Sequence, residues 1–405
     1  MSDYELRAAR PDELADVLRL DALVWGNGAD PARDRCYTEF LEADRAICAF
    51  HDGELVGVQC TVSLDLTVPG GARLPLAGAT WLLVHPLHRG RGLMAVLDTA
   101  VRSDPGFTEP LYGGMPHDPA VRRSRDEYGP ASRHAEWTID LTRHRGLRHV
   151  PEDDGTLEYV PVADAIAAMR EVAAGLQGVR NGWVRRKPCL DDYKYSLAHL
   201  AGASYGPITF VVHRDRAGSV DGVLAYQLGA SSESQGRPEG SLRVVELLGL
   251  STVVEAQLWK HCVDNRLVYQ LVALRRPVDD PVVYRLADPR DARPTIRDDM
   301  YLTLRDVPVA LSARRYARDD ALVIELRDGG RYRLEGGLDG ADCRPVTTTP
   351  DLTVSRAALS AAYLGDLSLR TSAGAGHVDE HTPGAVDRAA GMFTWAPAPW
   401  LQDIF

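Results

Sequence analysis

Two arginines and two glycines alternate four residues after an apolar run, in the segment WLLVHPLHRGRGLMA at residues 81–95. The apolar run is typical of a buried strand, and a helix is expected to follow it. The first N–H groups of a helix have no partner inside the helix and carry partial positive charge, so a helix start binds anions. Gly90 and Gly92 leave these amides accessible, and Arg89 and Arg91 add charged donors. The segment is therefore suited to hold a pyrophosphate.

Two familiar phosphate loops are excluded by the residue types. A Walker loop needs a Lys and a Ser or Thr after its last glycine, and a dinucleotide turn needs the spacing G-x-G-x-x-G. What remains is Arg89-x-x-Gly92 after an apolar strand. This pattern is common, and an exposed helix start with incidental arginines is the alternative interpretation. The strand in front of the pattern favours the binding interpretation.

The elements that position this segment follow from hydrophobic periodicity. Apolar residues at helical spacing indicate a helix over residues 11–23, and apolar or alternating runs indicate strands at 46–53, 54–68 and 72–84. Pro69-Gly70-Gly71 supplies the turn between the last two strands. We therefore expect a hairpin that leads into the arginine-glycine segment.

Two breaks divide the chain into three predicted domains, 1–148, 149–295 and 296–405. The stretches at 149–162 and 287–299 are rich in turn residues and charge, which is typical of boundaries. Each domain mixes helices with strands, so the fold class is α/β or α+β. In the last domain we expect two strands joined by Asp328-Gly329-Gly330, a helix over 354–365, a glycine-rich loop and an apolar tail.

Composition excludes several function classes. The net charge of −11 argues against a nucleic-acid partner and is compatible with cationic ligands. No apolar run is long enough to span a bilayer, and the first residues do not resemble a signal peptide, so we expect a cytoplasmic protein without a membrane partner. The six cysteines include no C-x-x-C pair, which indicates isolated buried thiols.

The arginine-glycine segment resembles the coenzyme A pyrophosphate loop of GCN5-related N-acetyltransferases (GNATs). Three features together resemble one branch, the Eis (enhanced intracellular survival) family: HPLHRGRGLM at 85–94, EYGPASRHAEWTIDL at 127–141, and a chain of about 400 residues ending in APAPWLQDIF. The resemblance covers essentially the whole chain. It implies two tandem GNAT domains with mixed sheets, the second degenerate, a sterol-carrier-like C-terminal domain, and a homohexamer.

The resemblance also assigns the coenzyme contacts. The strand backbone at 82–84 would lie against the pantetheine and residues 90–95 would hold the pyrophosphate, with a further contact at 118–119. The expected acetyl-coenzyme A site is Leu82, Leu83, Val84, Arg89, Gly90, Arg91, Gly92, Leu93, Met94, Ala95, Asp118 and Pro119. Met94 stands where the wider superfamily often has Gly or Ala.

The general base implied by the resemblance is the C-terminal carboxylate of Phe405, once the tail has entered the first domain. An α-carboxylate has a pKa of about 3.5, so it is ionised at neutral pH and accepts a proton from an ammonium, directly or through water. The tail carries Trp395, Trp400, Leu401, Ile404 and Phe405, more apolar surface than a solvated end exposes. Hydrophobic docking without chemistry is the alternative.

The general acid implied by the resemblance is a tyrosine five residues before the tyrosine of Tyr-Gly-Pro. Here Tyr128 begins that sequence, and Arg123 stands five residues earlier. Several interpretations stay open: Tyr128 protonates the departing thiolate, Arg123 stabilises the thiolate as a cation, or the arginines at 122, 123 and 125 belong to a solvated loop. A further one is a degenerate member that binds a ligand, or performs altered chemistry in a biosynthetic pathway, without acetyl transfer.

The remaining motifs do not indicate a second site. The matching junction LLGLSTVVEA at 247–256 has no Arg-Gly cluster, and Thr252 is expected to cap its helix with Glu255 at capping-box spacing, so we expect one coenzyme site per chain. HVDEH at 377–381 matches a zinc motif that works on a helix, but glycines and Pro383 indicate a loop, so no metal is expected.

The sequence thus predicts an acetyl-coenzyme A-dependent N-acetyltransferase acting on a small primary amine, which is aminoglycoside-like, polyamine-like or lysine-like. In this scheme Phe405 is the base, Tyr128 or water is the acid, and Arg123 is the departure from the family pattern.

Overall fold

The computed structural model describes residues 3–28, 30–116, 127–143, 145–195, 205–229, 233–234, 237–238, 240–403 and 405. The chain divides into two compact units. The first unit comprises Met1–Arg133, Arg180–Cys189 and Asp298–Phe405, and the second comprises His134–Val179 and Leu190–Arg297. This division into two units does not test the three domain boundaries predicted from the sequence, which stay predictions.

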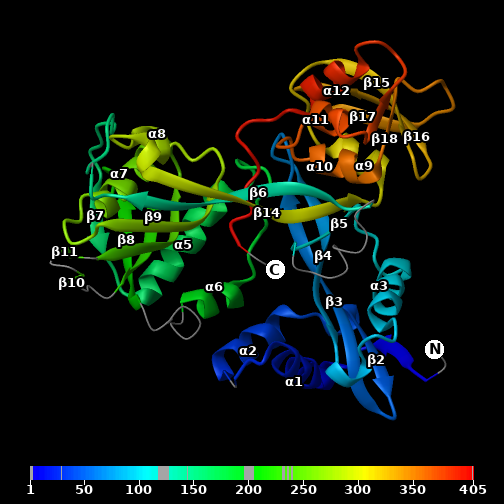
Figure 1. Cartoon of the computed structure of the whole chain (residues 1–405), viewed down its shortest axis with the longest axis horizontal. Helices are drawn as coiled ribbons and strands as arrows, with labels where there is room; N and C mark the ends of the chain where they lie inside the picture. Colours follow the sequence, from blue (N-terminus) through cyan, green and yellow to red (C-terminus); the bar gives the residue numbers. More distant parts are fainter. Residues whose placement is uncertain are drawn as a thin grey trace. The chain divides into compact units, whose positions relative to one another are not determined.

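The N-terminal part of the first unit is a sheet with helices packed against it (Figure 1). The strands follow the order β1-β2-β3-β4-β5, and the last residues of β14 pair with β5. The strands are β1 (Glu5–Ala8), β2 (Ala46–His51), β3 (Glu54–Thr67), β4 (Arg73–Val84), β5 (Leu111–Gly114) and β14 (Ala292–Leu304). The helices are α1 (Leu14–Trp25), α2 (Pro31–Phe40) and α3 (Leu93–Ser103), with short 3-10 turns at Pro11–Glu13, Ala43–Arg45 and Pro86–His88.

The predicted hairpin is β3 and β4, an antiparallel pair joined at Pro69-Gly70-Gly71. Both glycines have positive φ, +95° and +86°, which explains why this turn needs glycine. Val62, Leu64 and Leu66 are buried on β3 while Ser63 between them is exposed. This alternation is the one read from the sequence, and it gives the sheet a buried face.

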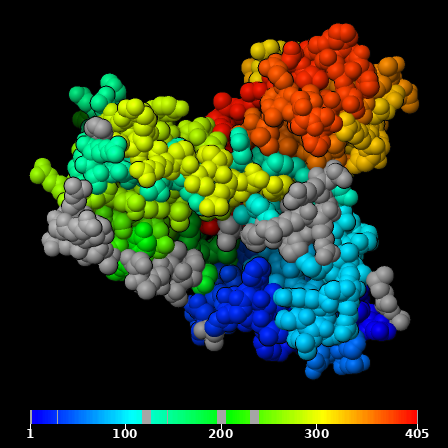
Figure 2. Space-filling view, in the orientation of Figure 1, coloured from blue at the N-terminus to red at the C-terminus, as the bar shows by residue number. Residues whose placement is uncertain are grey.

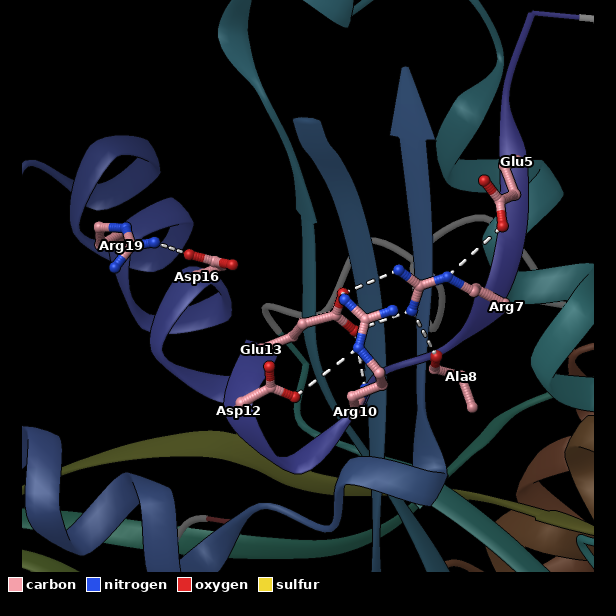
Figure 3. Close-up of polar contacts among 8 residues, drawn as sticks. All are labelled: Glu5, Arg7, Ala8, Arg10, Asp12, Glu13, Asp16 and Arg19. Carbon is pink, nitrogen blue, oxygen red and sulfur yellow. Dashed lines mark hydrogen bonds and ion pairs between the residues drawn. The ribbon is translucent and has the colours of Figure 1, made fainter. Parts of the chain in front are cut away.

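An ion-pair cluster fastens β1 to α1 (Figure 3). The Glu13 carboxylate accepts hydrogen bonds from both terminal nitrogens of Arg7 and from the Arg10 backbone N–H, each at 2.8 Å. These bonds, first of all those from the Arg7 guanidinium, lower the pKa of Glu13 to about 2. Glu13 therefore stays ionised at neutral pH and holds the edge strand to the start of the helix.

The C-terminal part of the first unit is a separate five-stranded sheet with the order β17-β16-β15-β18-β19. Its elements are α9 (Val307–Ala313), β15 (Asp320–Leu326), β16 (Arg331–Gly336), β17 (Ala341–Pro345), β18 (Leu352–Val354), α10 (Arg356–Ala362), α11 (Leu369–Gly374), β19 (Val378–Glu380) and α12 (Ala385–Phe393). The predicted strand pair and helix are confirmed. The expected glycine-rich loop is wrong, because α11 occupies Leu369–Gly374, with the Ser368 side chain accepting the Arg370 N–H at its start, and α12 was not predicted from the sequence.

Arg314 ties this C-terminal part together. Its side chain is fully buried, and its guanidinium donates to the carbonyls of Ala362, Tyr363 and Phe393, where α10 and α12 end. The guanidinium also lies over the rings of Phe393 and Tyr316, at 4.8 and 4.5 Å. One cation therefore satisfies the carbonyls of two helix ends, and the tail leaves from the second of these helices.

The strands of the second unit follow the order β6-β13-β12-β9-β8-β7. Its elements are β6 (Gly129–Asp140), β7 (Thr156–Tyr159), α5 (Val162–Leu176), α6 (Pro188–Tyr195), β8 (Tyr205–Arg214), β9 (Val220–Gly229), β12 (Ser241–Gly249), α7 (Thr252–Val263), β13 (Gln270–Pro277), α8 (Val282–Arg285) and the 3-10 turn Pro289–Asp291. A short pair, β10 (Glu233–Ser234) and β11 (Arg237–Pro238), lies apart from this sheet. The predicted strand and helix on either side of residue 250 are confirmed.

The cap of α7 differs from the prediction. Ser251, not Thr252, is the N-cap, and its hydroxyl accepts a hydrogen bond from the Val254 N–H at 3.2 Å. Thr252 is the first helical residue, so Glu255 lies one position too far along for a capping box. Ser and Thr stand side by side here, and the backbone conformation rather than the sequence selects between them.

All six cysteines are buried free thiols, as predicted. Burial raises the pKa of Cys48 and Cys343 to about 12, so both thiols are protonated at neutral pH. Among the described residues, no helix combines the length and the apolar composition that crossing a membrane would require.

His213 on β8 is buried between two carboxylates of the second unit. Its Nδ1 lies 2.5 Å from Asp221 and its Nε2 lies 2.8 Å from Asp153, in the segment before β7. Burial alone would lower the pKa of this imidazole, but the hydrogen bonds to Asp221 and Asp153 outweigh that effect, and the pKa is raised. When it is protonated, the imidazole donates to both carboxylates and so holds the 151–155 segment to the sheet.

Stability of the second unit is predicted to depend on this imidazolium. Because the folded pKa lies above the ordinary value of about 6.5, the stabilisation is complete below that value and is lost as the pH rises through the raised pKa. We expect the free energy of unfolding in urea to fall as the pH rises above about 6.5 and through the raised pKa, and His213→Gln to remove this dependence and cost about 2 kcal/mol at pH 6. The exposed-site control His377→Gln keeps the dependence; equal slopes for wild type and His213→Gln would contradict the assignment.

Candidate active site

The sheet of the first unit splits between β4 and β5. Leu76–Ala79 of β4 pairs in parallel with Leu111–Gly114 of β5. Beyond Ala79, β4 continues to Val84 without β5 beside it. Leu82, Leu83 and Val84 lie in this part of β4, and their side chains are buried. Backbone N–H and C=O groups along a strand that has lost one neighbour are available to a ligand.

A β-bulge marks the point of separation. Val58 of β3 faces Leu83 and Cys60 faces Thr80, so one β3 residue stands opposite both Trp81 and Leu82. Trp81 has a φ of +44°, and its indole packs edge-on against the Tyr37 ring at 4.8 Å and at a tilt against the Phe40 ring at 5.9 Å, both on α2.

The bulge also changes which residues share a face of the sheet. Ala77 and Ala79 before it, and Leu82 and Val84 after it, belong to one buried cluster under α3. Without the extra residue, Leu82 and Val84 would point to the opposite face. The bulge thus sets the orientation of the strand at the split.

The start of α3 is open, as the sequence predicted. Gly90 and Gly92 are exposed, have φ of +77° and +78°, and have no atom within 4 Å of the position that a Cβ would take. The first hydrogen bonds within the helix are donated by Ala95 and Val96, both to the Gly92 carbonyl. The preceding amides therefore form the free N-terminal turn of a helix beside the split strand.

The other predicted coenzyme residues of this loop surround that turn. Arg89 and Arg91 are exposed; the Arg89 Nε donates to the Val84 carbonyl at 3.4 Å and an Arg91 Nη donates to the Tyr4 hydroxyl at 3.5 Å. Leu93 is buried, Met94 half-buried and Ala95 exposed. Asp118, Pro119 and Arg123 lie outside the described residues.

Tyr128 lies in the apolar cluster below the split. It is 2% exposed and shares that cluster with Leu82, Val84 and Leu93. Its ring centroid is 5.9 Å from that of Tyr112, whose hydroxyl accepts a hydrogen bond from Gln59 at 2.9 Å. The structure therefore brings this candidate acid to the predicted coenzyme strand.

The C-terminal tail reaches the opposite face of the same strand (Figure 1). A Cβ on Gly78 would lie 2.9 Å from the Phe405 ring and 2.6 Å from Leu64. Gly78 pairs with Gly113 of β5, one residue before the two strands part. Trp400, Leu401 and Gln402 are buried, and only small red patches of the tail are visible in Figure 2.

A segment of ten residues, 180–189, anchors the tail and was not foreseen from the sequence. Asn181 accepts the Trp400 N–H at 2.9 Å through its carbonyl, and the Gln402 side-chain amide exchanges hydrogen bonds with the Val184 backbone. The Arg186 Nε lies 2.9 Å from Asp403. This segment also bonds to the end of β3, through Thr67 N–H to the Trp183 carbonyl and Gly182 N–H to the Thr67 carbonyl.

Comparisons with known proteins agree with this geometry. An acetyltransferase (GNAT) domain family matches residues 5–124, a second acetyltransferase (GNAT) domain family matches 182–305, and a sterol carrier protein domain family matches 307–402. An uncharacterized N-acetyltransferase of Streptomyces coelicolor is 33% identical over 394 residues, covering 94% of this chain and 95% of its own. The N-acetyltransferase Eis of Mycobacterium tuberculosis is 27% identical over 373 residues, covering 87% and 88%.

A solved structure extends the likeness to the whole fold. Eis1 from Mycobacterium abscessus superposes with a TM-score of 0.85 at 27% identity, over 99% of this chain and 100% of its own. This chain belongs to the Eis-like GNAT N-acetyltransferases. It is therefore an acyltransferase with two GNAT domains and a sterol-carrier-like domain, as predicted.

Two other features do not extend this Eis-like site. A groove of about 760 Å³ between α1 and α2 is lined by residues such as Leu18, Asp34 and Glu39, and by none of the predicted coenzyme residues. The HVDEH motif contains the strand β19 rather than only loop, and His381 lies 2.8 Å from the Thr353 hydroxyl. In the part of the chain that the structure describes, no group of three potential metal ligands comes together.

Substitution at the helix start is predicted to weaken coenzyme A binding. Gly92→Val places a branched side chain at φ +78° and over the free amides, so we expect the dissociation constant to rise by about tenfold or more, measured by calorimetry. The matched control is Gly218→Val, because Gly218 also has positive φ, +87°, and open space around its Cβ position, but lies in the turn between β8 and β9. An equal loss of affinity in both variants would count against the site.

Substitution under the tail is predicted to affect turnover instead. In Gly78→Ala the new methyl group would collide with the Phe405 ring and with Leu64, so we expect the Phe405 ring to be displaced. We expect kcat to fall by about tenfold or more, with the coenzyme A dissociation constant within about threefold of wild type. Gly28→Ala, at an exposed glycine with open space, is the control, and an unchanged kcat in Gly78→Ala would contradict a role for the tail.

Proposed function

We propose that this Eis-like protein transfers the acetyl group of acetyl-coenzyme A to a small primary amine. The observation that carries the proposal is the split between β4 and β5, which has an open glycine-bearing helix start beside it and Phe405 against Gly78. These features supply the three things that the reaction needs: a place for the thioester, donors for the pyrophosphate, and a carboxylate.

The proposed coenzyme position follows from the chemistry of each part of the site. The pyrophosphate accepts hydrogen bonds from the amides that begin α3, and the guanidinium groups of Arg89 and Arg91 balance its charge. The pantetheine amides pair with the β4 backbone at 82–84, in place of the missing neighbouring strand. The thioester then reaches the point where β4 and β5 part, between the face that carries Tyr128 and the face that carries Phe405.

In the proposed mechanism the Phe405 carboxylate takes a proton from the substrate ammonium, directly or through one water molecule. The neutral nitrogen forms a bond to the acetyl carbonyl carbon, and the backbone N–H groups around Leu83 stabilise the negative charge on the carbonyl oxygen. The C–S bond then breaks, the thiolate takes a proton from Tyr128 or from water, and the amide nitrogen loses its second proton to solvent.

The missing family tyrosine slows this scheme without stopping it. General acid catalysis contributes about 10²–10⁴-fold, and a thiolate is a stable leaving group because thiols have pKa values of about 8.5. Arg123 stands at the position where the family has its general-acid tyrosine, and it carries a positive charge that would favour the thiolate. Either route leaves the tail carboxylate as the base.

The amine is proposed from charge. A chain with a net charge of −11 attracts cations, and aminoglycosides, polyamines and lysine-like amines are cationic at neutral pH. A cytoplasmic location and a homohexamer stay predictions from the sequence and from the family resemblance.

The test of the base removes the carboxylate from its place and keeps the rest of the tail. Deleting Phe405 moves the chain end back by one residue, whereas Phe405→Leu keeps the terminal carboxylate where it is. In a thiol-release assay with acetyl-coenzyme A and a panel of amines, we expect the deletion to lower kcat by about 10²–10⁴-fold and Phe405→Leu by less than about tenfold. Tyr128→Phe and Arg123→Tyr, assayed in parallel, separate the two routes for the acid.

Two results would overturn parts of this proposal. Undiminished turnover after the deletion would keep the enzyme and remove the carboxylate from its mechanism. Absence of turnover in the wild type with every amine, together with absence of coenzyme A binding by calorimetry, would favour a protein that keeps the fold without acetyl transfer.

A further inference from the structure

The second unit repeats the split-strand geometry of the first. β12 and β13 are parallel, and only Ser241–Val244 of β12 pairs with Gln270–Ala273 of β13. β4 and β5 likewise pair over four residues only. β12 bulges against its antiparallel neighbour β9 directly after Val244, and Val245 is the extra residue. Leu247 therefore stands three residues past the last pair, the position that Leu82 has in the first unit.

A side chain fills the split in this second copy. Arg276 is 2% exposed, and its guanidinium donates one hydrogen bond to the Leu247 carbonyl and another, of 2.7 Å, to Asp280. It also lies 5.4 Å from the Trp259 ring of α7 and 3.7 Å from the Glu255 carboxylate. The β13 backbone turns it inward, because Arg275 has a φ of +53° and β13 bulges against β6 between Ala273 and Arg276.

The helix start next to this split is also closed. Residues 85–92 connect β4 to α3 with their glycines open, whereas only residues 250 and 251 connect β12 to α7. The Ser251 hydroxyl accepts the Val254 N–H. The Glu255 carboxylate sits in the first helical turn, where negative charge is favoured, and its side chain packs within 2.8 Å of the Cβ position of Gly249.

We propose that Arg276, with Glu255 and Asp280, occupies in the second unit the place that acyl-coenzyme A takes in the first. The guanidinium stands where the pantetheine would meet the strand backbone, and the Glu255 carboxylate stands at the helix start where the pyrophosphate would. The second unit is then a split sheet closed by its own side chains. This inference rests on the proposed function for the position of the coenzyme in the first unit.

The electrostatics of the cluster explain why this closure is stable and selective. A buried cation is tolerated when carboxylates and carbonyls pair with it, and removal of one partner is costly. The cluster presents Glu255 and Asp280 around Arg276, so an entering phosphate would meet negative charge once the guanidinium had moved. The first unit, in contrast, presents Arg89 and Arg91 at the corresponding helix start.

The test uses hydrogen exchange of the full chain with coenzyme A and with pantetheine, which has no phosphate and needs no pyrophosphate loop. In the wild type, both ligands are expected to protect residues 82–95 and to leave 244–256 unchanged. The double variant Arg276→Gly, Asp280→Asn removes the guanidinium from the split. It also removes the negative charge of Asp280, which would otherwise be left without its partner. We expect the amides at 244–249 to exchange at least about tenfold faster in this variant than in the wild type. Pantetheine, at the concentration that protects 82–84, is expected to slow this exchange again.

The control variant is Arg266→Gly, an exposed arginine of the same unit, which should leave exchange at 244–249 unchanged. Protection of 244–256 by coenzyme A in the wild type would overturn the proposal, and so would failure of pantetheine to protect 244–249 in a folded double variant. If the double variant does not fold, hydrogen exchange of the wild type with coenzyme A still tests whether residues 244–256 bind the coenzyme. Absence of protection at 82–95 in the wild type would instead contradict the proposed function.

Discussion

The structure depends on one local constraint: β4 leaves β5 after four paired residues. A parallel pair that ends early leaves backbone donors and acceptors without a neighbour inside the sheet, and such groups need a partner. The bulge at Trp81 lies just past the separation and turns Leu82 and Val84 onto the face of α3. Tyr37 and Phe40 hold the Trp81 ring, so α2 stabilises the backbone geometry on which coenzyme binding is proposed to depend.

The end of the chain is positioned by contacts far apart in sequence. Arg314 satisfies the carbonyl at the end of α12, the segment 180–189 accepts the tail along its backbone, and Phe405 stops against a glycine in the centre of a distant sheet. Chain ends are usually mobile because few contacts hold them. Here the buried Trp400 ring and the Arg186–Asp403 ion pair hold the end, as the proposed role of its carboxylate requires.

The two units show the same strand geometry with different contents. Both have a parallel pair that parts after four residues, a bulge, and a helix that follows the bulged strand. The first leaves the helix start open and lined by arginines, and the second closes it with Ser251, Glu255 and Arg276. The guanidinium of Arg276 supplies a hydrogen bond to the strand in the second split, and the proposed coenzyme would supply such bonds in the first.

The sequence by itself determined the arginine-glycine loop, the hairpin before it, the buried thiols, the family and the fold class, because local turn chemistry, periodicity and motif spacing carry that information. It did not determine the role of Trp81, the N-cap Ser251, the helices α11 and α12, or the anchoring segment 180–189. Those depend on backbone conformation and on pairings between residues more than 100 positions apart, such as Val184 with Gln402. Only the tertiary structure decided that Phe405 ends against Gly78 and that Arg276 fills the second split, because no local pattern records which distant strand a side chain will meet.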